Sequence, residues 1–135
     1  MITTDQYFAG KPHSPEQDAL AQHMLESVNE LLDEAEAAGI PRQICPNTGT
    51  EISGSKGGSG DGGFRLPTAT TGAATSSHKE ARAVDVYDPK GNLDDWLTDE
   101  ILEKYELYRE APNATVGWCH LSTRAPRSGK RTFNP

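Results

Sequence analysis

A chain of 135 residues with an apolar fraction of 34% predicts one domain, residues 1–135, around a modest hydrophobic core. The net charge of −7 disfavours nucleic acid as a partner, because the one basic cluster, residues 121–135, is short and contains no aromatic residue except Phe133. No segment approaches the roughly 20 apolar residues of a membrane span. The N-terminus also lacks the basic and apolar regions of a signal peptide, which predicts cytoplasmic localisation in the producing cell.

The longest predicted helix follows an N-terminal arm. Residues 1–13 are expected to be irregular, and a helix then starts with Ser14 as N-cap, Pro15 at the first helical position and Gln17 closing a capping box. Gly39 is expected to end it. The apolar positions that repeat at helical spacing are Leu20, Met24, Val28, Leu31, Leu32 and Ala35. This pattern predicts a helix with one buried face.

The middle of the chain is rich in glycine. Residues 45–63 hold seven of the 13 glycines, and residues 53–63 are predicted to form a Gly-rich loop. A phosphate-binding loop is disfavoured, because no Gly-Lys-Ser/Thr sequence occurs there. A loop at the edge of a substrate site and a plain connector both fit this composition. Residues 67–76 are a second stretch of small residues and are expected to be a linker.

The two cysteines, Cys45 and Cys119, do not belong to a C-x-x-C pair. This spacing disfavours a zinc site built from thiolates. We expect two reduced, partly buried thiols, and a disulfide between them is the alternative.

The strongest functional signal lies in residues 76–87, SSHKEARAVDVY, which predict a loop running into a short buried strand. His78 and Asp85 stand seven positions apart in this stretch, and His120 lies in a second apolar run, GWCHL. Imidazole and carboxylate groups are good zinc ligands, and three protein ligands leave one position open on a tetrahedral metal. That ligand count is typical of a catalytic zinc site.

The other elements predict an α+β fold. Asn92 is expected to cap one short helix and Thr98 to start a second, and a strand is expected at residues 107–109. No alternation of strands and helices supports a doubly wound fold. We predict one small domain in which the N-terminal helix covers an antiparallel sheet. The segments of Arg65, Asp85 and His120 are expected to lie on that sheet, with the metal site at its open face.

Three stretches of the chain occur in the order of a known set of motifs. GFR at residues 63–65, SHKEARAVD at 77–85 and WCH at 118–120 resemble the G-[FYW]-R, S-H-x-x-G-x-A-x-D and W-x-H motifs of the zinc D-Ala-D-Ala carboxypeptidase family. That family includes bacteriophage endolysins that cut peptidoglycan stem peptides. Residues 126–133 also resemble the C-terminus of phage-borne members. The resemblance implies a small zinc-peptidase domain of the DD-peptidase and hedgehog type.

The resemblance implies roles for five residues. His78, Asp85 and His120 would bind Zn²⁺, which polarises a scissile carbonyl and activates water. Arg65 would bind a substrate carboxylate bidentately or stabilise the oxyanion. Ser77 would orient His78 or donate a hydrogen bond to substrate, and a plain turn residue is the alternative. The implied function is hydrolysis of peptide bonds in peptidoglycan stem peptides, as a carboxypeptidase or an endopeptidase.

Two positions depart from the motifs. Ala81 stands where the family usually has glycine, and Gly117, three residues before His120, stands where many members have an acidic general base. Glu80 and Glu110 are the replacement candidates by placement. If no base exists, one alternative is a weak hydrolase that relies on zinc-bound hydroxide alone. The other is a catalytically silent cell-wall-binding or virion structural protein on the same zinc fold. The expected protein is a monomer that acts on the cell wall after release from the producing cell.

Overall fold

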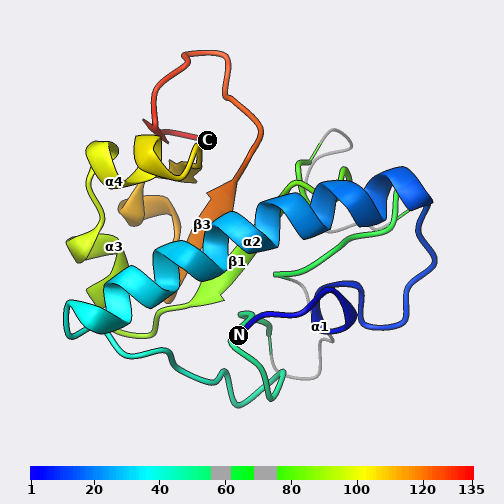
Figure 1. Cartoon of the computed structure of the whole chain (residues 1–135), viewed down its shortest axis with the longest axis horizontal. Coiled ribbons are helices and arrows are strands. Elements are labelled where there is room, and N and C mark those ends of the chain that lie inside the picture. The colour runs from blue at the N-terminus through cyan, green and yellow to red at the C-terminus, as the bar shows by residue number, and fades with distance from the viewer. Residues whose placement is uncertain (56–61, 69–75) are drawn as a thin grey trace.

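A long helix lies across a four-stranded sheet in the computed structural model, which describes residues 1–55, 62–68 and 76–135 (Figure 1). This helix is α2, Pro15–Ala37, and the predicted start is confirmed: Ser14 is its N-cap and forms a capping box with Gln17. Its buried residues are Ala21, Met24, Leu25, Val28, Leu31, Leu32 and Ala35. This face supplies one side of the hydrophobic core.

The sheet has the strand order β1-β3-β2-β4, with β1 at Ala83–Tyr87, β2 at Tyr108–Glu110, β3 at Trp118–Ser122 and β4 at Thr132–Phe133. Strand β3 pairs antiparallel with both β1 and β2, whereas β4 pairs parallel with β2. The α+β prediction is therefore confirmed, but the expectation of a purely antiparallel sheet is wrong. The chain reverses once after β3 and passes over β2, so β4 runs antiparallel to β3 and parallel to β2.

The segment that carries Arg65 is not a strand of the sheet, contrary to the prediction. Residues 62–66 lie beside β1 and make irregular backbone hydrogen bonds instead of a ladder. The amide of Asp85 donates to the carbonyl of Gly62 over 2.8 Å, and the amide of Arg65 donates to the carbonyl of His78 over 3.2 Å. Because Arg65 bonds to the turn before β1, its side chain is placed beside that turn.

The N-terminal arm contains a short helix that we did not predict, α1 at Thr4–Phe8. Thr3 and Gln6 form its capping box, a signal that was present in the sequence. Tyr7 is fully buried, and its hydroxyl donates to the carbonyl of Ala83 over 2.8 Å. The amide of Phe64 in turn donates to the carbonyl of Tyr7 over 3.0 Å. The arm therefore joins the Arg65 segment to the start of β1.

Two short helices, α3 at Asn92–Trp96 and α4 at Asp99–Lys104, precede β2, and a 3-10 turn, η1 at Pro112–Ala114, precedes β3. Thr98 caps α4 as predicted. The prediction that Asn92 caps α3 is wrong, because the side chain of Asp88 accepts the hydrogen bonds from the amides of Leu93 and Asp94. This carboxylate completes the helix start that Asn92 was expected to provide.

The cysteines and the Gly-rich stretches can also be compared with the predictions. Cys45 and Cys119 are both free and buried, as expected for reduced thiols. Most of the predicted Gly-rich loop and linker, residues 56–61 and 69–75, lies outside the described residues. Among the helices that the structure describes, none has the length and apolar character needed to cross a membrane.

Candidate metal centre

The structure brings the three predicted ligands together. His78 lies in the turn before β1, Asp85 is the central residue of β1, and His120 is the central residue of β3. Asp85 and His120 are direct partners in the antiparallel register of the two strands. One ligand atom from each of the three side chains lies within 4.8 Å of the others. Only 3%, 8% and 5% of His78, Asp85 and His120, respectively, is exposed, so the group is buried.

The orientation of His78 is fixed by a backbone carbonyl. Its Nδ1 lies 2.9 Å from the carbonyl oxygen of Gly63, which only accepts hydrogen bonds, so Nδ1 carries the proton. Nε2 then faces Oδ1 of Asp85 over 3.3 Å. A neutral imidazole presents a lone pair in this direction, and a carboxylate oxygen presents another. Two acceptors that face each other in a buried site fit a shared cation.

The turn that carries His78 depends on a left-handed residue. Ala81 has a φ of 62°, a region in which the Cβ of an L-residue is strained and glycine is favoured. This conformation gives a physical reason for the glycine that the S-H-x-x-G-x-A-x-D motif has at the corresponding position. Ser76 also stabilises the turn, because its hydroxyl accepts a hydrogen bond from the amide of His78 over 3.3 Å.

The carboxylate at the centre of the group is strongly stabilised in its charged form. Burial alone would raise the pKa of Asp85, but when no metal is bound and Nε2 of His78 also carries a proton, the charge of His78 and the hydrogen bonds from His120 and His78 outweigh burial and lower this pKa well below its usual range. Burial opposes the charge on His120, yet its hydrogen bond with Asp85, 2.9 Å from Nδ1 to Oδ1, raises the pKa of His120. The site therefore favours an anion surrounded by cationic or metal partners.

A cleft of about 460 Å³ opens onto this group. Of the other predicted site residues, Arg65, Ser77 and Glu110 line the cleft. The guanidinium Nη2 of Arg65 lies 3.8 Å from Oδ2 of Asp85, which places a cation beside the ligand group. The two imidazoles and the carboxylate thus form a buried floor of the cleft, with the half-buried arginine beside them.

Glu80 does not line the cleft, although it is only two residues after His78. Its Oε1 accepts a hydrogen bond from Nη1 of Arg124 over 3.2 Å, and its Oε2 lies 3.9 Å from Nε of Arg82. Glu80 therefore ties the ligand turn to the segment after β3. Of the two candidate bases, only Glu110 is directed toward the site.

The strand register explains the placement of Glu110. Arg109 pairs with Leu121 in the antiparallel register of β2 and β3, so the next position along puts Glu110 opposite His120. Glu110 pairs on its other side with Phe133 of β4. The ring of Phe133 meets that of His120 edge-on at 6.3 Å between centroids. Asp85, His120, Glu110 and Phe133 therefore form one row across the four strands.

Several cleft residues were not identified from the sequence. Trp118 and Ser122 line the cleft, although neither was predicted to be a site residue. Both stand two residues from His120, so the period-2 alternation of a strand was the available signal. Gly117 is not among the lining residues, and its φ of 98° marks it as a turn position. The residues of the segment after β3 that also line the cleft include Arg124, Pro126, Arg127 and Phe133.

The donor set fits a divalent transition metal. Two imidazole nitrogens and one carboxylate oxygen are the ligand types and number that catalytic zinc sites use. The Gly63 carbonyl behind His78 is the outer partner that such ligands usually have. Comparisons of the chain with family models, with curated proteins and with solved structures find no match. The chemistry of the site therefore rests on its own geometry.

Proposed function

We propose that this chain is a zinc-dependent metallopeptidase that hydrolyses peptide bonds in peptidoglycan stem peptides, as a carboxypeptidase or an endopeptidase. The observation that supports this best is the buried group of His78, Asp85 and His120 at the floor of a cleft. A structural zinc site is usually closed by four protein ligands, whereas this group offers three and opens onto the cleft. The cleft is also lined by Arg65 and Glu110, which can stabilise an oxyanion and carry a proton during peptide hydrolysis.

His78, Asp85 and His120 would hold the metal through Nε2, a carboxylate oxygen and Nδ1. When bound there, zinc supplies a Lewis acid for the scissile carbonyl and lowers the pKa of water. The fixed tautomer of His78 keeps its Nε2 unprotonated and directed into the site.

Glu110 would be the proton carrier of the reaction. Its carboxylate accepts a proton from the attacking water and returns it to the amine nitrogen of the leaving peptide. Its position opposite His120 in the sheet and in the lining of the cleft supports this role. This placement compensates for Gly117, which has no side chain to carry a proton. Glu80 is a weaker candidate because Arg124 and Arg82 engage it outside the cleft.

Arg65 would bind negative charge on the substrate. Its guanidinium is rigid and always charged, so it suits either a free carboxylate or the oxyanion of the tetrahedral intermediate. The hydrogen bond from its own amide to the carbonyl of His78 holds the arginine at a fixed place relative to the ligand turn. This connection supports a positioned cation rather than a mobile surface arginine.

The decisive test combines metal analysis with hydrolysis. The purified chain is expected to contain about one zinc per molecule and to release peptide fragments from purified peptidoglycan, with His78→Ala and His120→Ala losing both properties. Absence of zinc after expression in zinc-supplemented medium would contradict the proposal. A zinc-containing protein that is inert on all peptidoglycan types would instead support a catalytically silent cell-wall-binding or virion structural protein.

A further inference from the structure

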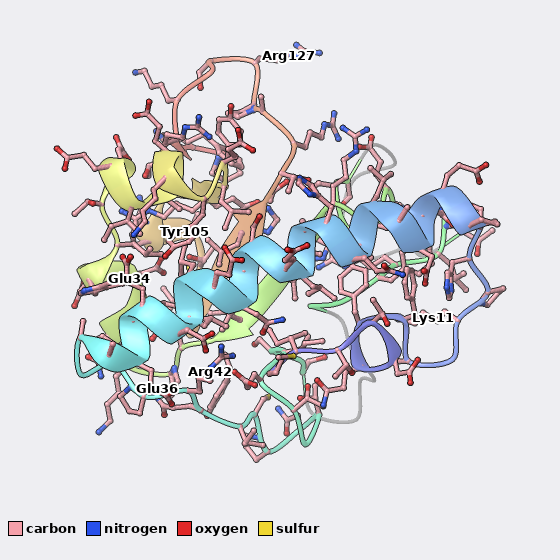
Figure 2. The ribbon with its side chains drawn as sticks, in the orientation of Figure 1. Lys11, Glu34, Glu36, Arg42, Tyr105 and Arg127 are labelled. Carbon is pink, nitrogen blue, oxygen red and sulfur yellow. The ribbon has the colours of Figure 1, made fainter. Side chains whose placement is uncertain are left out.

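We propose that the cleft binds an acidic peptide, and that Arg127 recognises a carboxylate of the substrate a few residues away from the cleaved bond. This inference rests on the proposed peptidase function and adds a second recognition point to it. Arg127 lies in the loop between β3 and β4, on the segment that lines the cleft after the His120 strand. Figure 2 shows it at the outer turn of this loop, away from the sheet.

The loop between β3 and β4 is held as a wall of the cleft. At its start, Nη1 of Arg124 donates to Oε1 of Glu80, which links the loop to the ligand turn. At its end, the guanidinium of Arg131 lies 4.4 Å from the ring centroid of Tyr108 and donates to the carbonyl of Leu107. Arg127 stands between these two attachments, so its position relative to the metal centre is constrained.

The side chains that line the cleft carry three positive and two negative charges, whereas the chain as a whole is acidic. The chain has a net charge of −7, yet three arginines, Arg65, Arg124 and Arg127, are among the lining residues. Asp85 and Glu110 are the acidic side chains among those lining residues, and Asp85 belongs to the ligand group. A bound divalent metal would add further positive charge. A cationic cleft in an acidic protein selects an anionic ligand and disfavours a basic one.

The three arginines differ in what they already contact. Arg65 lies beside Asp85, and Arg124 is paired with Glu80. Arg127 is exposed and has no ion pair or hydrogen bond with any residue of the described ranges 1–55, 62–68 and 76–135. Its guanidinium can therefore turn toward a ligand without breaking a contact within these ranges. Arg127 is the residue of this wall best suited to a bidentate contact with a carboxylate.

The dimensions of the cleft favour a short peptide over a long polyanion. Its volume of about 460 Å³ fits a few residues, and Trp118, Pro126 and Phe133 add apolar surface between the charged groups. Apolar walls with separated cations suit a peptide whose backbone packs against the rings and whose carboxylates reach the arginines. A polymer of phosphates would need a continuous basic track instead.

The test compares Arg127→Gln with Lys130→Gln in the zinc-loaded full chain. Lys130 is an exposed cation of the same loop and is absent from the lining of the cleft, so it is the matched control. The substrates are pairs of synthetic peptides based on the stem peptide. Each pair has either Glu or Gln at one of the three residues on either side of the cleaved bond. We expect wild type to prefer Glu at one position by about two- to fivefold in KM, which is the range of effect for a partly exposed ion pair. Arg127→Gln should abolish this preference, and Lys130→Gln should retain it.

The two proposals can fail separately. Cleavage by wild type and Arg127→Gln with the same Glu-to-Gln ratio would overturn the role of Arg127 and leave the peptidase function intact. If no peptide is cleaved, the dissociation constants of the same peptides are measured by calorimetry. A preference for one Glu peptide that Arg127→Gln removes would support the acidic-peptide site in a non-catalytic protein. Equal binding of Glu and Gln peptides, or no binding of either, would overturn it.

Discussion

Glu110 of β2 lies opposite His120 of β3, in the same row of the sheet that also contains Asp85 of β1. Antiparallel partners have their Cβ atoms about 4.5–5.5 Å apart and point to the same face. The register of two strand pairs therefore brings together the carboxylate and one imidazole of the candidate metal site and a second carboxylate. Glu110 lines the cleft that opens onto the candidate metal site, whereas its placement ten residues before His120 in the sequence made it only one of two candidates.

Glu110→Gln tests whether the carboxylate of Glu110 carries a proton during hydrolysis. Glu110→Gln keeps the size of the side chain but cannot accept a proton, so hydrolysis of peptidoglycan should fall by about 10²–10⁴-fold. Zinc content should remain unchanged, because Glu110 is outside the ligand group. Hydrolysis rates and bound zinc are measured on the same preparations.

Glu80→Gln is the matched control for Glu110→Gln. Glu80 contacts Arg124 and Arg82 and does not line the cleft, so its substitution should leave turnover within about threefold of wild type. Full activity of Glu110→Gln together with a large loss in Glu80→Gln would reverse the assignment of the two carboxylates. Full activity of both would show that neither carries the proton.

The long helix and the three side chains of the candidate metal site were predictable from the sequence because their signals are local. The capping box at Ser14 and the helical spacing after it define α2. Asp85 and His120 lie in short apolar segments, His78 lies in the polar loop just before the first of them, and the structure brings all three together. Local patterns of this kind survive in the fold because packing does not compete with them.

The edge strand of the sheet and the walls of the cleft could not be predicted from the sequence, because they depend on pairing between segments that are far apart in the chain. Strand β4 has only two residues, and its parallel pairing with β2 follows from the path of the chain over that strand. The Arg65 segment alternates like a strand but bonds to the ligand turn and to Tyr7 instead. Glu110 lines the cleft because of its register in the sheet, and the composition around Glu110 and Glu80 does not show which of the two lies there. These are tertiary choices that override local β-propensity.

Arg65→Lys tests whether the planar guanidinium is required. Lysine keeps the positive charge but loses the two-pronged donor geometry that matches a carboxylate or oxyanion. We expect hydrolysis to fall at least about tenfold, which corresponds to about 1.4 kcal/mol of transition-state stabilisation. Zinc content should be unchanged. Wild-type turnover in this variant, measured at the same zinc loading, would return Arg65 to a structural role.

Tyr7→Phe tests the connection between the N-terminal arm and the site. The substitution removes the buried hydroxyl that donates to the Ala83 carbonyl over 2.8 Å and leaves that acceptor without its partner. The free energy of unfolding should fall by about 1–2 kcal/mol. Tyr105→Phe is the control, because its hydroxyl bonds to Glu34 near the surface, and it should cost less than half as much. Equal losses in the two denaturant titrations would contradict a special role for the arm.

Gly62→Ala tests the backbone packing behind the central ligand. A Cβ at Gly62 would overlap the carbonyl oxygen of Ser53 and lie 2.9 Å from the Cβ of Asp85. Gly62 also accepts the hydrogen bond from the amide of Asp85, so its displacement would move the ligand strand. We expect a loss of about 2–3 kcal/mol in the free energy of unfolding and a weaker affinity for zinc.

The control for Gly62→Ala is Gly129→Ala, which separates steric overlap from backbone strain. Gly129 has a φ of 70° and nothing within 4 Å of the position of a Cβ, so alanine there should cost only the left-handed strain of about 1 kcal/mol. Zinc affinity should not change, because Gly129 lies in the loop between β3 and β4. The prediction is checked by denaturant unfolding and by zinc titration against a competing chelator. If both variants bind zinc as tightly as wild type, the close approach of Gly62 to Asp85 does not position the ligand.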